Sequence, residues 1–294
     1  MPFPDFDPVI FSIGPLDFRW YAMAYVLGIV LGWWYAARLA RATSLWAPTE
    51  PPVTSRQLDD LMLWITLGII LGGRFGYALF YQPHLYGDLF TGSTWGERLA
   101  LFRLWDGGMS FHGGLIGVSL AVLWFATKQK IRLLSLGDLI APVAPIGLGL
   151  GRLANFVNGE LWGRVTDAPW GINFCNARAR QMYGVLCEYP GGPGVLPRHP
   201  SQLYEAFLEG VVLLSVLALA IFRGRLLARP GYVTGLFLLG YGLIRASLEN
   251  VRQPDFGMES YPFGLTMGMM LPFPMILAGA WLIWRARTRP PVSA

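Results

Sequence analysis

The stretch LMLWITLGIILGGRFGYALFY, residues 61–81, decides the fold class of this chain. It carries one charged side chain, Arg74, among apolar residues and glycines. A helix needs about 20 mostly apolar residues to cross roughly 30 Å of hydrocarbon, so the stretch predicts a membrane-spanning helix.

Composition and six further apolar stretches extend this prediction to the whole chain. Of its 294 residues, 54% are hydrophobic and 14% are charged, whereas a soluble domain is about 25% charged. We therefore predict an all-α integral membrane protein with about seven transmembrane helices, forming a single polytopic domain over residues 1–294. The predicted spans are about 20–37, 61–81, 111–127, 133–155, 203–222, 231–249 and 266–284.

Basic residues set the predicted orientation of these spans. Clusters following the first, third, fifth and seventh spans hold twelve of the 23 Lys and Arg residues, and seven-span threading puts all four on one side. Cytoplasmic loops carry such an excess, so we expect a periplasmic N-terminus and a cytoplasmic C-terminus. The first span should be permanent, because acids and prolines precede it where a cleavable signal peptide would be basic. The clusters are Arg38, Arg41 and Arg56; Lys128, Lys130 and Arg132; Arg223, Arg225 and Arg229; and Arg285, Arg287 and Arg289.

The segment 156–202 is rich in Gly, Pro and polar residues, which predicts a small periplasmic cap rather than a span. It contains the only two cysteines, Cys175 and Cys187. No metal-ligand spacing surrounds them, so they are either two free thiols or a disulfide within an external loop.

Glycine and proline spacing makes two further predictions about the spans. Asp138, Pro142 and Pro145 should interrupt the fourth span. Small residues four apart let helix backbones approach closely where lipid gives no hydrophobic drive for association. Such pairs are Gly68 with Gly72, Gly72 with Gly76, Gly113 with Gly117, and Gly147 with Gly151.

Arg74, Arg152 and Arg245 lie within or at the ends of apolar stretches, where charge is expensive. An arginine at mid-membrane costs roughly 2.5–3.5 kcal/mol on insertion scales. Each could be a helix-end residue that reaches towards water, an explanation that suits Arg74 better than the other two. The alternative is an anion-binding site among the spans, because a guanidinium donates two parallel hydrogen bonds to phosphate.

Polar residues recur around two of these arginines. Tyr241, Arg245, Glu249 and Arg252 follow one another at spacings of four, four and three, which places them on one helical face. This face is either a structural Arg–Glu pair or an anion-binding surface on which Glu249 orients Arg245. In GRLANFVNGELWGR, residues 151–164, a second face combines arginine with asparagine, ahead of a helix break near Asn158-Gly159. The residues of this second group are Arg152, Asn155 and Glu160.

A histidine lies in WDGGMSFHGGLIGV, residues 105–118, at the predicted outer mouth of the third span. His112 is either a hydrogen-bonded structural group or a general base, since imidazole changes charge near neutral pH. His84 follows a loop proline, and His199 belongs to RHPSQLYE, which predicts a helix entry with Ser201 as N-cap and Glu205 in the first turn.

The chain contains no GxSxG elbow, P-loop, dinucleotide fingerprint or metal-ligand spacing. We therefore predict catalysis without metal or cofactor on a phosphate-bearing lipid. The net charge of +5 is too small to suggest a nucleic-acid partner.

Four motifs in order resemble those of bacterial prolipoprotein diacylglyceryl transferases, and the likeness runs from residues 6–21 to the last span. It is weakest over 165–195, and the cysteines are not part of the pattern. The motifs are WDGGMSFHGGLIG, GRLANFVNGELWGR, VLPRHPSQLYE and YGLIRASLENVRQPD.

The resemblance implies an inner-membrane enzyme with its active site toward the periplasm. Such an enzyme moves the sn-1,2-diacylglyceryl group of phosphatidylglycerol to the lipobox cysteine of a prolipoprotein signal peptide. The products are a thioether and glycerol phosphate. Residue by residue, it implies catalytic roles for His112, Arg152, Arg245 and Glu249, and lipid binding by Tyr21, Arg152, Asn155, Glu160, Tyr241 and Arg245.

The residues and the implied reaction are chemically compatible. A phosphate leaving group needs preorganised donors in a dry site, which arginines supply. A thiol reacts as thiolate, so either His112 takes its proton or the arginine field favours the thiolate. The rival functions are an anionic-solute transporter, although no clear two-fold repeat of spans is present, and another phospholipid-head-group enzyme.

Overall fold

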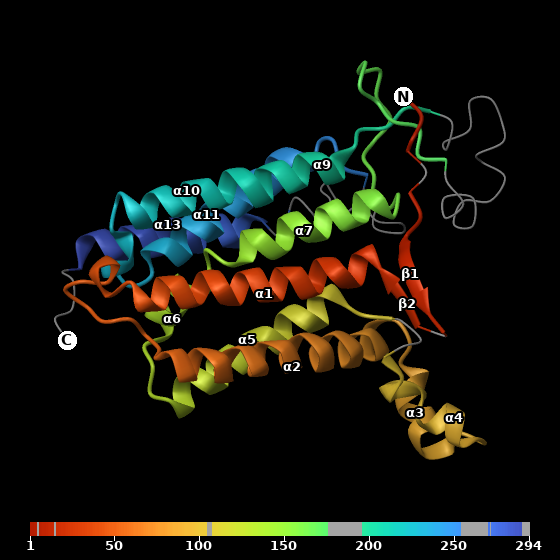
Figure 1. The fold of residues 1–294 in the computed structure, drawn as a ribbon, viewed down its shortest axis with the longest axis horizontal. Coiled ribbons are helices and arrows are strands. Elements are labelled where there is room, and N and C mark those ends of the chain that lie inside the picture. Colours follow the sequence, from red (N-terminus) through yellow and green to blue (C-terminus); the bar gives the residue numbers. More distant parts are fainter. Residues whose placement is uncertain are drawn as a thin grey trace. The chain divides into compact units, whose positions relative to one another are not determined.

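The computed structural model describes residues 1–4, 6–14, 16–104, 108–175, 196–253, 270 and 272–289. The chain forms two compact units, one of Met1–Glu50 with Gly137–Ala294 and one of Pro51–Leu136. We call these unit 1 and unit 2 and describe each by itself. Helices built from the apolar stretches make up most of both units (Figure 1).

Unit 1 begins with a β-hairpin of β1 (Val9–Ile13) and β2 (Leu16–Arg19), which leads directly into α1 (Trp20–Arg41). Phe11 and Phe18 stack across the hairpin with ring centroids 4.5 Å apart. The Ser12 hydroxyl and then the Arg19 guanidinium hold the pKa of Asp17 below its usual range.

The fourth apolar stretch is interrupted, as its prolines predicted. It forms α6 (Leu133–Ile140), which contains the unit boundary, and α7 (Ala144–Val157). Asp138 is fully buried and accepts hydrogen bonds from the backbone N–H of Gly231 at 2.6 Å and of Thr234 at 2.7 Å. A carboxylate there satisfies free N–H groups at the start of the helix that follows Gly231.

The helix that begins after residue 200 packs on α7, and the last two helices of unit 1 pack on each other (Figure 1). One continuous rod comprises α9 (Ser201–Glu205), the π-helical turn η5 (Ala206–Val212) and α10 (Leu213–Phe222). The short 3₁₀ turn η1 (Thr43–Leu45) follows α1. A second one, η6 (Leu226–Ala228), lies between α10 and the final pair of helices in the unit. That pair is α11 (Tyr232–Leu248) and α13 (Pro272–Thr288).

Glycines set close helix contacts in unit 1, and one member of the pair that spacing predicted takes part in them. A Cβ added to Gly28 of α1 would lie 3.4 Å from the Cα of Gly147, so Gly147 lies at the α1–α7 contact, whereas a Cβ on Gly151 would meet no described atom within 4 Å. On the same helix Gly149 packs on a different neighbour, because its Cβ would lie 3.2 Å from the Cα of Gly210 in η5. Spacing alone does not show which face of a helix turns towards a neighbour.

Unit 2 is a pair of long helices, α2 (Ser55–Phe80) and α5 (Phe111–Lys128), joined by shorter elements. The three glycine pairs predicted on these helices are confirmed as close contacts, since Cβ atoms on them would overlap the facing backbone. The connecting elements are α3 (His84–Thr91), α4 (Trp95–Arg98) and η2 (Ala100–Phe102).

Arg74 of α2 donates hydrogen bonds to the segment that connects α2 with α5. Its Nε donates to the carbonyl of Leu101 at 2.8 Å, Nη2 to that of Ala100 at 2.7 Å, and Nη1 to that of Gly108 at 3.2 Å. The side chain is buried and therefore does not reach towards water. Its role is to satisfy backbone carbonyls within unit 2.

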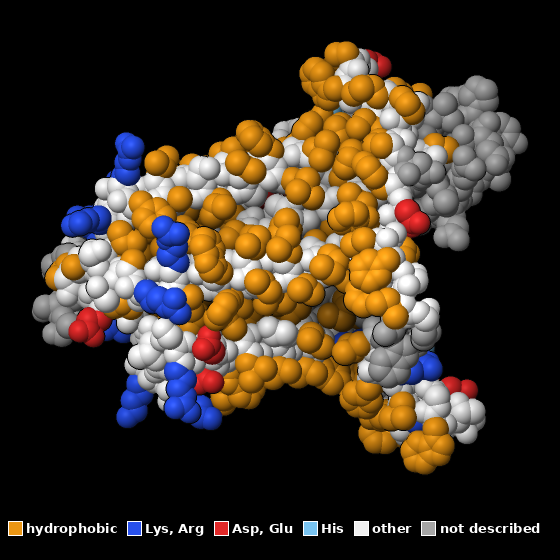
Figure 2. Space-filling view, in the orientation of Figure 1, with side chains coloured by type: hydrophobic (Ala, Val, Ile, Leu, Met, Phe, Trp, Pro, Cys, Tyr) orange, Lys and Arg blue, Asp and Glu red, His pale blue; other side chains and the backbone are white. Residues whose placement is uncertain are grey.

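Five helices among the described residues are long and apolar enough to cross a membrane, so the chain is a multi-pass membrane protein. Figure 2 shows apolar side chains covering the sides of the helices, as contact with lipid requires. A sixth apolar helix, α11, is shorter, and the first part of the predicted span 266–284 lies outside the described residues. The five are Trp20–Arg41, Ser55–Phe80, Phe111–Lys128, Leu133–Val157 and Ser201–Phe222.

Residues 158–175 and 196–200 form an irregular segment between α7 and α9, tied by isolated β-bridges to the N-terminus and to Arg252. Cys175 is disulfide-bonded and so is not a free thiol. Cys187 and the rest of this predicted cap lie outside the described residues.

We expect Gly117→Ala to destabilise the protein, because the new methyl group would overlap the carbonyl oxygen of Gly68. Overpacking of this kind costs about 1–3 kcal/mol. Gly114→Ala is the matched control on the same helix, since its Cβ would make only an ordinary 3.7 Å contact. Thermal unfolding in detergent should show a lower midpoint for Gly117→Ala alone, and equal midpoints would contradict the α2–α5 contact.

Candidate active site

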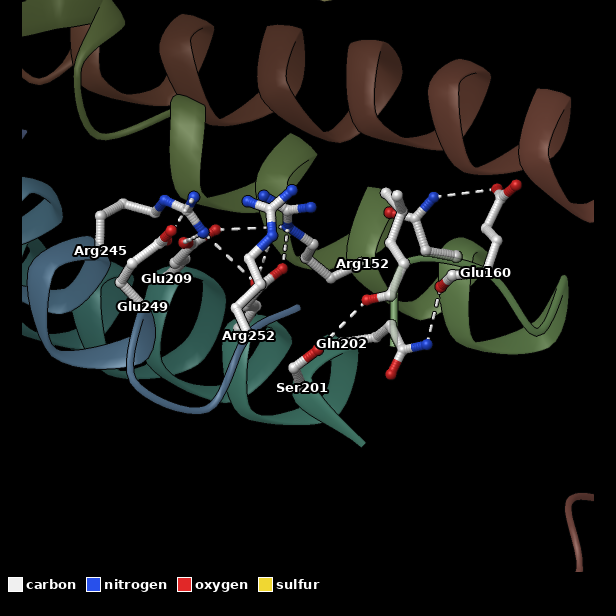
Figure 3. Close-up of polar contacts among 11 residues, drawn as sticks. Arg152, Glu160, Ser201, Gln202, Glu209, Arg245, Glu249 and Arg252 are labelled. Carbon is white, nitrogen blue, oxygen red and sulfur yellow. Dashed lines mark hydrogen bonds and ion pairs between the residues drawn. The ribbon is translucent and has the colours of Figure 1, made fainter. Parts of the chain in front are cut away.

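A cluster of arginines and glutamates lies inside unit 1, where α7, the α9–η5 rod and α11 meet (Figure 3). Arg152 of α7 places its Nε 2.8 Å from Glu205 Oε2 and 3.5 Å from Glu209 Oε2. Arg245 of α11 places its Nη1 3.3 Å from Glu205 Oε1 and 3.7 Å from Glu209 Oε1. The two predicted arginines thus share two carboxylates.

Two residues at the end of α11 complete the cluster. Glu249 lies 3.8 Å from Nη2 of Arg245, so the predicted pair exists but is longer than the contacts with Glu205. Arg252 follows the helix and approaches Glu205 Oε1 at 4.0 Å. We call the six residues the Arg–Glu cluster: Arg152, Arg245, Arg252, Glu205, Glu209 and Glu249.

The π-helical turn places the two central carboxylates. Glu205 ends α9 and Glu209 lies one turn later in η5, so both side chains face the same side. They are 1% and 0% exposed, and isolated charges at such depth would be very costly. The cluster contains three arginines and three glutamates, so its formal charge is zero. This pairing lowers the free-energy cost of burying the six side chains.

Arg152 retains hydrogen-bond donors that the cluster does not use. Its contacts with Glu205 and Glu209 are both made by Nε, at 2.8 and 3.5 Å. Among the described residues, no hydrogen bond is donated by its two terminal nitrogens. Its side chain is 17% exposed, so these donors are available to an added anion in a mostly dry setting.

A second polar group follows the end of α7, which stops at Val157 near the predicted break. Asn155 and Asn158 each donate a side-chain N–H to Glu160 Oε1 at 3.1 Å. Gln202 donates to the carbonyl of Glu160 at 2.7 Å, and its own Oε1 is buried without a hydrogen-bond partner. Glu160 is therefore held from two sides (Figure 3).

The helix entry of the RHPSQLYE motif differs from its prediction. Pro200 is the N-cap, and Ser201 instead donates its hydroxyl to the carbonyl of Leu161 at 3.2 Å. Glu205 lies at the end of α9, not in its first turn, and pairs with arginines. The sequence motif predicts local roles at a helix start for Ser201 and Glu205. In the structure both contact residues that lie far away along the chain.

The two predicted tyrosines belong to helices of the same unit. Tyr21 is the second residue of α1, which packs on α7, and its hydroxyl lies 3.2 Å from that of Tyr25. Tyr241 lies one turn before Arg245 on α11 and stacks on Phe237 with centroids 5.8 Å apart. Both remain candidates for contact with a substrate.

The histidines differ in their surroundings. His112 is exposed in the first turn of α5, which Ser110 caps by accepting the N–H of Gly113 at 3.2 Å. His112 belongs to unit 2, whereas the residues of the Arg–Glu cluster belong to unit 1. His199 contacts the hydroxyl of Tyr204 at 3.3 Å, and His84 lies 4.0 Å from Asp88 in an exposed pair.

Sequence reasoning missed Glu209 and Gln202 and misinterpreted Glu205. A signal for Glu209 was present, because an acid inside the predicted span 203–222 needs a partner just as the arginines do. Among the described residues, no group of three or more His, Cys, Asp or Glu could hold a metal ion.

Comparison with known proteins assigns the chain to a family. A family described as prolipoprotein diacylglyceryl transferase matches residues 8–285. The chain belongs to the prolipoprotein diacylglyceryl transferase family. Three relatives are named phosphatidylglycerol–prolipoprotein diacylglyceryl transferase. The one from Caulobacter vibrioides NA1000 / CB15N is 56% identical over 99% of this chain and 96% of its own. Those from Phenylobacterium zucineum and Brucella anthropi are 55% and 49% identical, each over 97% of this chain and 94% of their own.

For this transferase family member we expect Glu205→Gln to be more destabilising than Glu249→Gln. Glu205 contacts three arginines, two of them within 3.3 Å, whereas Glu249 contacts Arg245 at 3.8 Å. Removing one partner of a buried ion pair costs about 3–5 kcal/mol. Thermal unfolding should rank the variants in this order, with the exposed Asp88→Asn as an unaffected control. The reverse order would contradict a central role for Glu205.

Proposed function

We propose that the protein transfers the sn-1,2-diacylglyceryl group of phosphatidylglycerol to the lipobox cysteine of a prolipoprotein. The sulfur forms a bond with C3 of the diacylglyceryl group as the bond from C3 to the phosphate oxygen breaks. The thiol proton passes to a base, and glycerol phosphate leaves. Family membership and the names of close relatives support this reaction.

The observation that carries the proposal is the orientation of Arg152, whose Nε is held by Glu205 and Glu209 and whose terminal nitrogens donate no hydrogen bond among the described residues. A rigid guanidinium whose two terminal nitrogens can still donate matches two oxygens of a phosphodiester. As the phosphate departs its charge grows, and fixed donors in a dry site stabilise that charge most. We assign this role to Arg152.

We assign a joint role to Arg245 and Glu249. Contacts of Arg245 with Glu205 and Glu249 fix the plane of its guanidinium, so that it meets the phosphate without reorganisation. Asn155 and Glu160 would bind the glycerol end, because an amide and a carboxylate together can donate and accept with its hydroxyls. Tyr21 and Tyr241 would border the lipid.

We propose that His112 accepts the thiol proton. Its exposed position at the start of a span leaves the imidazole accessible to a secreted lipobox. The prolipoprotein signal peptide and phosphatidylglycerol are the proposed partners.

The proposed topology has seven spans in the bacterial inner membrane, with the N-terminus and segment 156–202 periplasmic and the C-terminus cytoplasmic. Within unit 1, α1, α10 and α13 all end in or just before basic residues, at the end where α7 and α11 begin (Figure 1). Arg152 and Arg245 lie late in α7 and α11, towards the other end. The positive-inside rule then favours a site on the periplasmic side.

The activity is tested by incubating the purified protein with phosphatidylglycerol and a lipobox peptide. A diacylglyceryl thioether on the cysteine is the expected product, and neither a transporter nor a lipid phosphatase would form it. Arg152→Lys and Arg245→Lys keep the charge and lose the fork, so we expect turnover to fall by about 10²–10³-fold with near-normal membrane abundance.

Arg74→Lys is the matched control, because Arg74 binds carbonyls within unit 2. It should lower stability and have a milder effect on turnover per folded molecule. If lysine is tolerated equally at Arg152 and Arg245, their role is only diffuse electrostatic attraction.

Removal of the proposed base should slow the reaction without abolishing it. For His112→Gln we expect a loss of about 10²–10⁴-fold, the usual worth of general-base assistance. The acid limb of the pH profile of kcat/KM should disappear in this variant. An unchanged acid limb would make His112 a positioning residue and leave thiolate formation to the arginines.

Reporter fusions test the topology. A fusion within residues 176–190 should be active only with a reporter that works in the periplasm. Activity of a cytoplasmic reporter there would reverse the orientation and put the Arg–Glu cluster towards the wrong leaflet.

A further inference from the structure

A groove of about 440 Å³ lies between α11 and α13, away from the Arg–Glu cluster. Leu236 and Leu239 of α11 and Ala280 of α13 line its apolar part. Tyr232, the first residue of α11, lies 13 positions before Arg245, which separates them by roughly 20 Å along the helix. The groove is therefore distinct from the candidate active site.

Two glycines explain why the helices leave a groove. A Cβ on Gly279 would lie 2.7 Å from the carbonyl oxygen of Gly235, so the backbones touch at this crossing. Larger side chains such as Trp284, which is 63% exposed, must lie beside the crossing. A mostly apolar groove lies beside the crossing.

The polar end of the groove consists of Tyr232 and Arg287. The phenol oxygen accepts hydrogen bonds from Arg287 Nη2 at 2.9 Å and Nε at 3.2 Å, so its own proton is free to donate elsewhere. No described residue pairs with Nη1 of Arg287. An anionic oxygen placed here would meet two donors, one of them charged.

Among the described residues, no acidic side chain pairs with the arginines at this end of the groove. Arg285, in the same turn as Arg287, lies over the ring of Trp281 at 6.0 Å. The nearby acid Asp138 is fully buried, and its oxygens are occupied by Gly231 and Thr234. An apolar groove with a cationic mouth complements an acyl chain that carries an anionic head group.

We propose that this groove binds one anionic glycerophospholipid that is not turned over. An acyl chain lies along Leu236, Leu239 and Ala280, and the phosphate accepts from Arg287 and the Tyr232 hydroxyl. Basic pockets between spans on the arginine-rich side of a membrane bind such head groups. The bound lipid would bridge α11, which carries Arg245, to α13.

A photoreactive phosphatidylglycerol with a diazirine in its acyl chain tests the proposal. We expect it to label residues 232–239 and 280–287 of the full chain in phosphatidylcholine nanodiscs. Unlabelled phosphatidylglycerol should compete and phosphatidylcholine should not. Arg287→Gln should weaken competition at this site about fivefold. Ala280→Trp should fill the groove and abolish its labelling.

Arg289→Gln is the matched control, since it removes one charge from the same helix end without lining the groove. Absent labelling, equal competition by phosphatidylcholine, or a loss for Arg289→Gln equal to that for Arg287→Gln would overturn the proposal. A dimer that Ala280→Trp dissociates, with no lipid label, would show that a second copy covers the groove and would also overturn it. The readout is labelling at the groove, so it is independent of whether the transferase activity exists.

Discussion

The pairing of arginine with glutamate in a low-dielectric interior is the constraint on which unit 1 depends. Arg152 and Arg245 come from different helices, and the carboxylates between them come from a third. Each helix must turn its charged side chain inward at one depth, because an unpaired charge facing lipid would be far more costly. The cluster thus fixes both the rotation and the axial register of α7, the α9–η5 rod and α11. Preorganisation of the proposed phosphate site is then a consequence of how the unit is assembled.

Glycine contacts supply the packing that charge pairing cannot. Lipid tails are as apolar as leucine, so spans associate through close backbone approach instead of hydrophobic burial. Gly149 with Gly210 brings α7 close to η5, and Gly235 with Gly279 does the same for α11 and α13. The first contact lies close in sequence to Arg152 and Glu209 of the Arg–Glu cluster, and the second lies beside the groove near the start of α11. The elements α7, η5 and α11 therefore carry both the close glycine contacts and the charged residues of the Arg–Glu cluster.

Much of the candidate site could be predicted, because an arginine in an apolar stretch is conspicuous. Arg152 and Arg245 were identified from cost alone, and Asn155 and Glu160 from their spacing beside a break in the helix. Glu205 was misinterpreted, since a local rule for helix starts explained it without reference to its arginine partners 40 to 53 positions away. The predictions for Ser201 and Gly151 failed for the same reason. Each was assigned a role from its neighbours in sequence, whereas its contacts depend on which helices meet.

The sequence by itself determined the membrane class, most of the helices, the interruption of the fourth span and the family motifs. These properties depend on local composition and period, which one segment displays without its neighbours. Only the tertiary structure decided that Glu205 and Glu209 hold the two arginines, that Arg74 binds backbone carbonyls, and that Gly149 packs against Gly210. A span can rotate about its axis without changing its hydropathy. The choice of face is made only when several helices satisfy their charges and their packing at once.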